Sequence, residues 1–93
     1  MKLYLVHAGF YDDDVSGGFY ESHTNYFVAA EDVKKAKKKA KTIPEYKDKK
    51  MHIDGIMEVN QVDGYEIVLH PVENGTSGRQ KQYGYDDVKS IDS

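Results

Sequence analysis

The sequence predicts a small α+β domain in which one helix packs on one face of a mainly antiparallel, four-stranded sheet. Two strand-like segments precede a single strongly helical segment, two more follow it, and turn residues separate neighbouring segments. With 93 residues, the chain has room for one domain with a thin core. We assign the β-β-α-β-β domain to residues 1–70 and a polar C-terminal extension to residues 71–93.

The first two predicted strands are residues 2–8 and residues 21–30. The first, KLYLVHA, is apolar on both faces, which is typical of a central strand. The second, ESHTNYFVAA, is polar in its first half and apolar in its second half, so its polar half is expected at the edge or mouth of the sheet. Residues 9–18 contain three aspartates and a Gly-Gly pair, which predict a connecting loop.

The predicted helix covers residues 31–42. Glu31 and Asp32 fall in its first turn, where the helix dipole favours acidic side chains. A narrow apolar stripe recurs at helical spacing and comprises Val33, Ala36, Ala40 and Ile43. Pro44 is expected to end the helix, and residues 45–50 read as a charged linker.

Two further strands are predicted at residues 51–60 and 65–70. The first alternates, with its apolar face formed by Met51, Ile53, Met57 and Val59 and its polar face by His52, Asp54 and Glu58. Asp63-Gly64 is a turn signal between the two strands, and Pro71 ends the second. The polar chain beyond Pro71 is expected to hold a short terminal strand or helix.

The amino-acid composition excludes several classes of protein and of site. The absence of cysteine excludes a disulfide scaffold, a thiolate zinc site and a cysteine nucleophile. The net charge of −3 gives no general attraction to nucleic acid or to anionic membranes. Because no segment resembles a signal peptide or reaches the length of a membrane span, we expect a soluble, cytoplasmic protein with no membrane partner.

Two His–carboxylate pairs are the most informative constellation in the chain. Glu21 and His23 are two residues apart in one predicted strand, and His52 and Asp54 are two apart in another, so each pair points to one face. If the two strands are neighbours, the pairs converge into a site for zinc, iron or manganese, or for acid–base chemistry. The same pattern is also typical of half-exposed strands without a function, so both interpretations stay open.

The other two histidines are weaker candidates for a site. His7 is in phase with the apolar residues of the first strand and reads as a core-edge histidine. His70 lies at a strand end before a proline, where a solvated side chain is expected.

A lysine run surrounds the apolar stripe of the predicted helix. Its residues best placed to contact an anion or nucleic acid are Lys34, Lys37, Lys38 and Lys41. Lysine is also a good helix former on a solvated face. The overall acidity and the absence of arginine in this run favour the solvated face, since lysine alone gives no bidentate readout of bases.

Several of these motifs together resemble DUF1543, a family of small bacterial proteins of unknown function. The resemblance covers roughly residues 1–70, and its matching elements are Met1 to Leu5, Gly17-Gly18, Glu21 with His23, Phe27 to Ala30, Ala36-Lys37, Ala40-Lys41, and His52 with Asp54. The chain departs from the family pattern where F-x-V-A is shortened to F-V-A-A and in the tail after Pro71. The resemblance supports the fold prediction and implies no activity, because the family carries none that is established.

The sequence favours a non-enzymatic interaction or regulatory module. No catalytic motif is present, and a small domain has little room for a pocket. One face of the predicted sheet is left uncovered, so we expect a homodimer or another protein partner on that face. The alternatives are a metal-binding or hydrolytic protein that uses the two His–carboxylate pairs, and a nucleic-acid binder that uses the lysine-rich helix.

Overall fold

The computed structural model describes residues 1–73, 75 and 81–92. Its main element is a three-stranded antiparallel sheet in the order β2-β1-β3, whose strands are β1 (Lys2–Phe10), β2 (Ser22–Ala30) and β3 (His52–Glu58). The predicted α+β class and the mainly antiparallel pairing are confirmed, and β1 is the central strand as expected.

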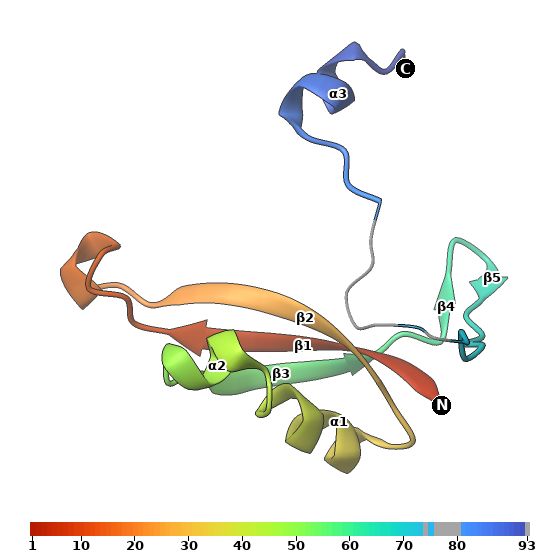
Figure 1. Cartoon of the computed structure of the whole chain (residues 1–93), viewed down its shortest axis with the longest axis horizontal. Helices are drawn as coiled ribbons and strands as arrows, with labels where there is room; N and C mark the ends of the chain where they lie inside the picture. Colours follow the sequence, from red (N-terminus) through yellow and green to blue (C-terminus); the bar gives the residue numbers. More distant parts are fainter. Residues whose placement is uncertain (74, 76–80, 93) are drawn as a thin grey trace.

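Two helices lie on the same side of this sheet, α1 (Val33–Ala40) and α2 (Pro44–Asp48) (Figure 1). Helix α1 begins later than predicted because Asp32 is its N-cap, and the Asp32 carboxylate accepts a hydrogen bond of 2.8 Å from the backbone N–H of Lys35. Helix α2 was not predicted from the charged segment 45–50. Pro44 ends the first helical pattern but also begins α2, since proline suits the first turn of a helix.

The core lies between the sheet and the two helices. Its buried residues are Tyr4, Val6, Ala8 and Phe10 of β1, Val28 and Ala30 of β2, Ala36 and Ala40 of α1, Tyr46 of α2, and Met51. The fully buried Ala36 and Ala40 bring α1 close to the sheet because their side chains are small. Val33, expected on the same stripe, is 54% exposed, so this stripe is narrower than predicted.

A β-bulge interrupts the pairing of β1 with β3. His7 pairs with Gly55 and Ala8 pairs with Ile53, so Asp54 is an extra residue on β3. Ile53 and Ile56 therefore both pack against the core, although three positions separate them. Met57 is 62% exposed, and the prediction that it shares a face with Ile53 is wrong because the bulge shifts the alternation by one residue.

The predicted four-stranded sheet is wrong, because the fourth predicted strand, at residues 65–70, does not join the other three. Only its first two residues form a strand, and that strand pairs with residues 61–62, which were expected in the connection. Strands β4 (Gln61–Val62) and β5 (Tyr65–Glu66) pair with each other beyond the end of β3 (Figure 1). The predicted turn is confirmed, with positive φ angles of 51° at Asp63 and 82° at Gly64. The chain leaves the sheet close to the start of β1, where the backbone N–H of Val59 donates a hydrogen bond to the carbonyl of Leu3. Because β1 does not continue beyond this point, β4 and β5 have no part of it to pair with.

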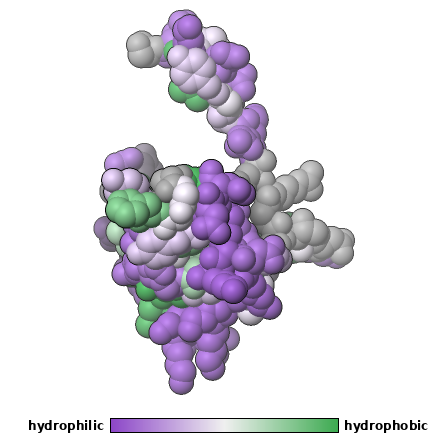
Figure 2. All heavy atoms as spheres, turned by 90° about the vertical axis from the view of Figure 1, so that its left-hand side faces the viewer, coloured by the Kyte–Doolittle hydropathy of each residue, from purple (hydrophilic) through white to green (hydrophobic). Residues whose placement is uncertain are grey.

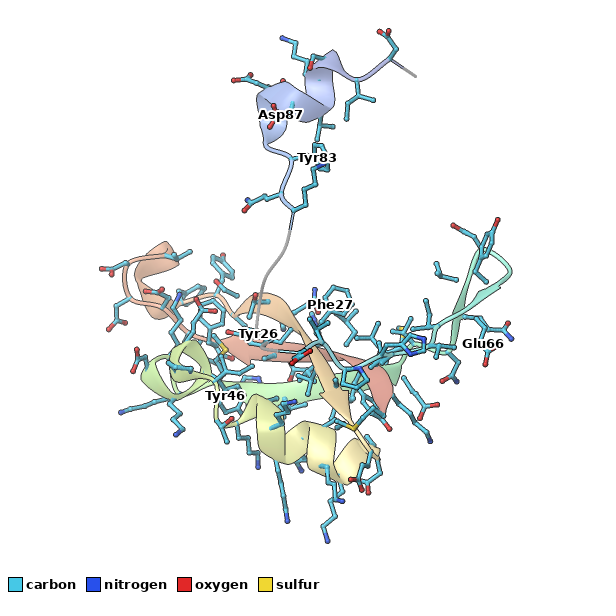
Figure 3. All side chains as sticks on the ribbon, turned by 45° about the vertical axis from the view of Figure 1, so that its right-hand side comes forward. Tyr26, Phe27, Tyr46, Glu66, Tyr83 and Asp87 are labelled. Atoms are coloured by element: carbon cyan, nitrogen blue, oxygen red, sulfur yellow. The ribbon has the colours of Figure 1, made fainter. Side chains whose placement is uncertain are left out.

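The C-terminal extension contains a short helix, α3 (Tyr85–Ser90), in line with the expectation of a terminal strand or helix. All of its residues are exposed, and Tyr83 and Asp87 mark this segment in Figure 3. Residues 74, 76–80 and 93 of the predicted extension lie outside the described part of the chain. Among the described residues, no helix combines the length and the apolar character needed to cross a membrane.

Tyr26 joins β2 to helix α2. Its hydroxyl donates a hydrogen bond to the Glu45 carboxylate and lies 3.6 Å from the sulfur of Met51. Partial burial, together with the hydrogen bond and negative charge of Glu45, raises the pKa of Tyr26 to about 12. The neutral phenol therefore supports the packing of α2 against the sheet.

We predict that Glu45→Gln lowers the pKa of Tyr26 while leaving it above the ordinary value of 10, because burial still disfavours the phenolate. NMR titration of the tyrosine ring carbons measures this shift. Since the folded-state pKa is raised, the stabilisation is complete below pH 10 and is lost as the pH rises toward about 12. Glu66→Gln, on the distant hairpin, is the matched control, and an unchanged Tyr26 titration in Glu45→Gln would contradict the assignment.

Candidate metal centre

The antiparallel pairing brings the two predicted His–carboxylate pairs to the same end of the sheet. Strands β2 and β3 both run antiparallel to β1, so the beginnings of both strands flank the end of β1. Gly9 of β1 pairs with His23 on one side and with His52 on the other. This end of the sheet faces the viewer in Figure 2, where hydrophilic side chains cover most of the surface.

The four predicted residues meet on the sheet face opposite the helices, which we call the open face. The Nε2 atom of His52 lies 2.5 Å from Oε1 of Glu21 and 3.1 Å from Oδ1 of Asp54. The Nε2 atom of His23 lies 3.0 Å from Oδ2 of Asp54 and 3.5 Å from Oε1 of Glu21. We name the set Glu21, His23, His52 and Asp54 the His–carboxylate cluster. It brings together His23 of β2, His52 and Asp54 of β3, and Glu21, which directly precedes β2 rather than lying in it as predicted.

His7 adjoins the cluster, and its predicted place at the edge of the core is wrong. It is exposed on the same sheet face, and its ring stacks on that of His23 with 4.8 Å between the centroids and 6° between the planes. The Nδ1 atom of His7 lies 2.8 Å from Oδ1 of Asn25, its partner on β2. His7 therefore belongs to the polar end of the open face, whereas His70 is exposed as predicted and lies in neither set of possible metal ligands found among the described residues.

Gly9 makes the room that the cluster occupies. A Cβ atom at this position would lie 2.2 Å from Oε1 of Glu21, 2.7 Å from Oδ2 of Asp54 and 2.8 Å from Nε2 of His52. These separations are too short for non-bonded atoms, so any larger residue would displace the cluster. We predicted Gly9 to be in the connecting loop, but it is buried within β1. A glycine directly after an apolar strand was the one signal for it in the sequence.

The cluster is shielded only in part. Between 30% and 47% of each of its side chains is exposed, so an ion from solution can reach it. Ionised carboxylates only accept hydrogen bonds, and in the absence of a metal the Nε2–H groups of His23 and His52 must donate to them. The same nitrogen and oxygen atoms are the ones that would bind a metal ion.

The other half of the open face is apolar. It carries Leu3, Leu5, Phe27 and Met57, of which Phe27 is 65% exposed (Figure 3). A shallow hollow of about 320 Å³ lies at the boundary between the two halves, and its lining consists of Leu5, His7, Asn25, Gly55, Ile56 and Met57. The apolar half of the open face is therefore continuous with the polar end.

The lysines proposed for anion contact lie elsewhere. Lys34, Lys37, Lys38 and Lys41 are exposed on or next to α1, and α1 covers the opposite face of the sheet from the cluster. Two other lysines of the run have local partners, since Lys35 pairs with Glu31 at 2.6 Å and Lys39 donates to the carbonyl of Ala29. The nucleic-acid alternative stays a prediction, separate from the His–carboxylate cluster.

A family model described as a Domain of Unknown Function (DUF1543) matches residues 18–69, which is more than half of the chain. The chain belongs to the DUF1543 family. The matched segment contains all four residues of the cluster but neither His7 nor Gly9 of β1. No curated protein and no solved structure is significantly similar to this DUF1543 protein.

We predict that Gly9→Ala disturbs the cluster with little loss of fold. The new methyl group must push aside the flexible Glu21 carboxylate and so break its contact with His52. Imidazole resonances of His23 and His52 should shift in NMR spectra while circular dichroism stays unchanged. In the matched control Gly55→Ala, the added Cβ meets no atom within 4 Å, and the same resonances should stay in place. Equal effects of the two substitutions would contradict the assigned role of Gly9.

Proposed function

We propose that this DUF1543 protein binds a divalent transition-metal ion, which is zinc, iron or manganese, at Glu21, His23, His52 and Asp54. The observation that carries the proposal is that two His–carboxylate pairs meet in the fold, although His23 and His52 are 29 residues apart in the sequence. Imidazole nitrogens together with carboxylate oxygens are the ligands that these three metals share.

The spacing of the donor atoms suits a coordination sphere. With metal–ligand bonds of about 2.1 Å, ligand atoms around a tetrahedral ion lie about 3.4 Å apart. Three of the four separations lie close to this value, at 3.0 Å for His23–Asp54, 3.1 Å for His52–Asp54 and 3.5 Å for His23–Glu21. The fourth, 2.5 Å between His52 and Glu21, must widen by about 1 Å to reach it. Side-chain movements of this size are enough to admit an ion, and the absence of a side chain at Gly9 leaves room for the ligand atoms themselves.

Ion pairing without a metal is the simplest alternative account of the cluster. In that case the Nε2 atoms of His23 and His52 carry hydrogens that point to the carboxylates, and added metal does not change the melting temperature. If a metal does bind, the exposure of the site leaves coordination positions for water. A metal ion makes bound water more acidic, and this is the route to the hydrolytic form of the proposal.

We predict that the protein, purified without a chelator or a histidine tag, retains near-stoichiometric zinc, iron or manganese in elemental analysis. After a chelator has removed the metal, adding it back should raise the melting temperature. At a free metal concentration roughly 100-fold above the Kd, the free energy of unfolding should rise by about 2.7 kcal/mol. His52→Ala should lose both effects because it removes a ligand.

His70→Ala is the matched control, since it removes an exposed imidazole outside the cluster. This variant should keep the metal. If the wild-type protein contains no metal, and if zinc, ferrous iron and manganese each leave its melting temperature unchanged, the proposal fails.

A second function, self-association through the open sheet face, is favoured by the apolar half of that face. Phe27 and Met57 are 65% and 62% exposed beside Leu3 and Leu5. Contiguous exposed apolar side chains are typical of protein interfaces. A second copy of the chain is the occupant we propose, because a two-fold axis would set the same apolar half of each copy against the other.

We predict that sedimentation analysis shows a dimer at high concentration and that Phe27→Asp converts it to a monomer, since a charge would be buried in the interface. Phe19→Asp is the control, because Phe19 is equally apolar and 76% exposed but precedes β2 and lies outside the open face. A wild-type protein that stays monomeric at the highest soluble concentration would exclude the self-association.

A further inference from the structure

We infer that the cluster takes two metal ions, with Asp54 as the ligand that bridges them and His7 as a ligand of the second ion. The inference rests on the proposed metal binding and extends it. The sequence pairs Glu21 with His23 and His52 with Asp54, and the structure adds contacts between the two pairs, from His23 to Asp54 and from His52 to Glu21.

The two carboxylate oxygens of Asp54 face different histidines. Oδ2 lies 3.0 Å from His23, and Oδ1 lies 3.1 Å from His52. Asp54 therefore stands between the two imidazoles, one from each edge strand. A carboxylate placed in this way can bind one ion through each oxygen, which is how carboxylates bridge the metal pairs of two-metal sites.

The donor atoms form two sets that share only Asp54. One set consists of His7, His23 and Asp54, and the other of Glu21, His52 and Asp54. Within each set all ligand atoms lie within 4.8 Å of one another. Three protein ligands for each ion are the number found in metal sites that keep a position open for water or substrate.

His7 is held in a form that can bind metal. The amide oxygen of Asn25 only accepts hydrogen bonds, so the Nδ1 atom of His7 carries the hydrogen and donates it over 2.8 Å. In a neutral ring this leaves Nε2 with a free lone pair. Ligand histidines commonly have such a partner on their second nitrogen, which fixes the tautomer and the ring orientation.

The stack of His7 on His23 sets a requirement for the second ion. The lone pair of an imidazole lies in the plane of its ring, and the two rings are parallel to within 6°. One of the rings must turn out of the stack before both nitrogens can point at the same ion, and that ring gives up its present contact, which is with Asn25 for His7 or with Asp54 for His23. Both rings are exposed, so this turn needs no rearrangement of the core.

The charge balance indicates what the two ions would bind in turn. The cluster supplies two carboxylates, from Glu21 and Asp54, against four positive charges on two divalent ions. The excess of positive charge and the open coordination positions favour an anionic ligand such as hydroxide or phosphate. His7, a ligand of the second ion, also lines the hollow on the open face.

The test is the zinc stoichiometry of the full chain, measured by calorimetric titration and by elemental analysis after gel filtration. The wild-type protein should bind two zinc ions per chain. His7→Ala should bind one, because the set of Glu21, His52 and Asp54 stays intact. His70→Ala, the matched control, should bind two.

Manganese gives an independent readout of the bridge. Two Mn²⁺ ions joined by Asp54 are magnetically coupled, so the electron paramagnetic resonance spectrum of the loaded protein should show a coupled pair. The coupled signal should disappear in His7→Ala and in Asp54→Asn.

Each of the other possible outcomes overturns a specific part of the inference or of the proposed function. One zinc ion in the wild-type protein and in His7→Ala overturns the two-ion inference and leaves the proposed metal binding in place. Two ions in both proteins, or two uncoupled manganese ions, overturn the roles of His7 and Asp54. Absence of binding in the wild-type protein overturns both the inference and the proposed function.

Discussion

The position of Gly9 in the central strand is the constraint on which the open face depends. Both neighbours of β1 are antiparallel to it, and their registers place His23 and His52 opposite the same residue. The four side chains of the cluster then need the volume above that residue, and a single methyl group there would lie 2.2 Å from Glu21. The sheet pairing thus brings the functional groups together, and the missing side chain of Gly9 lets them stay together.

The side chains of strand β1 alternate between the core and the open face. Tyr4, Val6 and Ala8 point into the core beneath α1 and α2, while His7 and Gly9 alternate with them on the open face. The core is small, because the contribution of α1 is limited to two alanines and that of α2 to Tyr46. Since the cluster shares no side chain with this core, substitutions in the cluster leave the core contacts intact.

Period-two spacing was enough to predict which side chains share a face within each His–carboxylate pair, but not that the pairs meet. Their meeting depends on strand order, and β1 separates the strands that carry them. The bulge at Asp54 has no pattern of its own, although it decides that Ile56 rather than Met57 reaches the core. The Asp63-Gly64 turn was predictable from local chemistry. Whether its hairpin joins the sheet was not, because that depends on where β1 begins.

The two proposed functions use one surface and are therefore coupled. His7 and Asn25 line the hollow from the polar side, and Leu5 and Met57 line it from the apolar side. A second copy packed on the apolar half of the open face would lie at the edge of the cluster, exclude water from it and strengthen its electrostatic interactions. By linkage, a metal ion that binds the dimer more tightly than the monomer must tighten the dimer by the same factor for each ion bound. A metal that leaves the association unchanged would mean that the dimer interface stops short of His7.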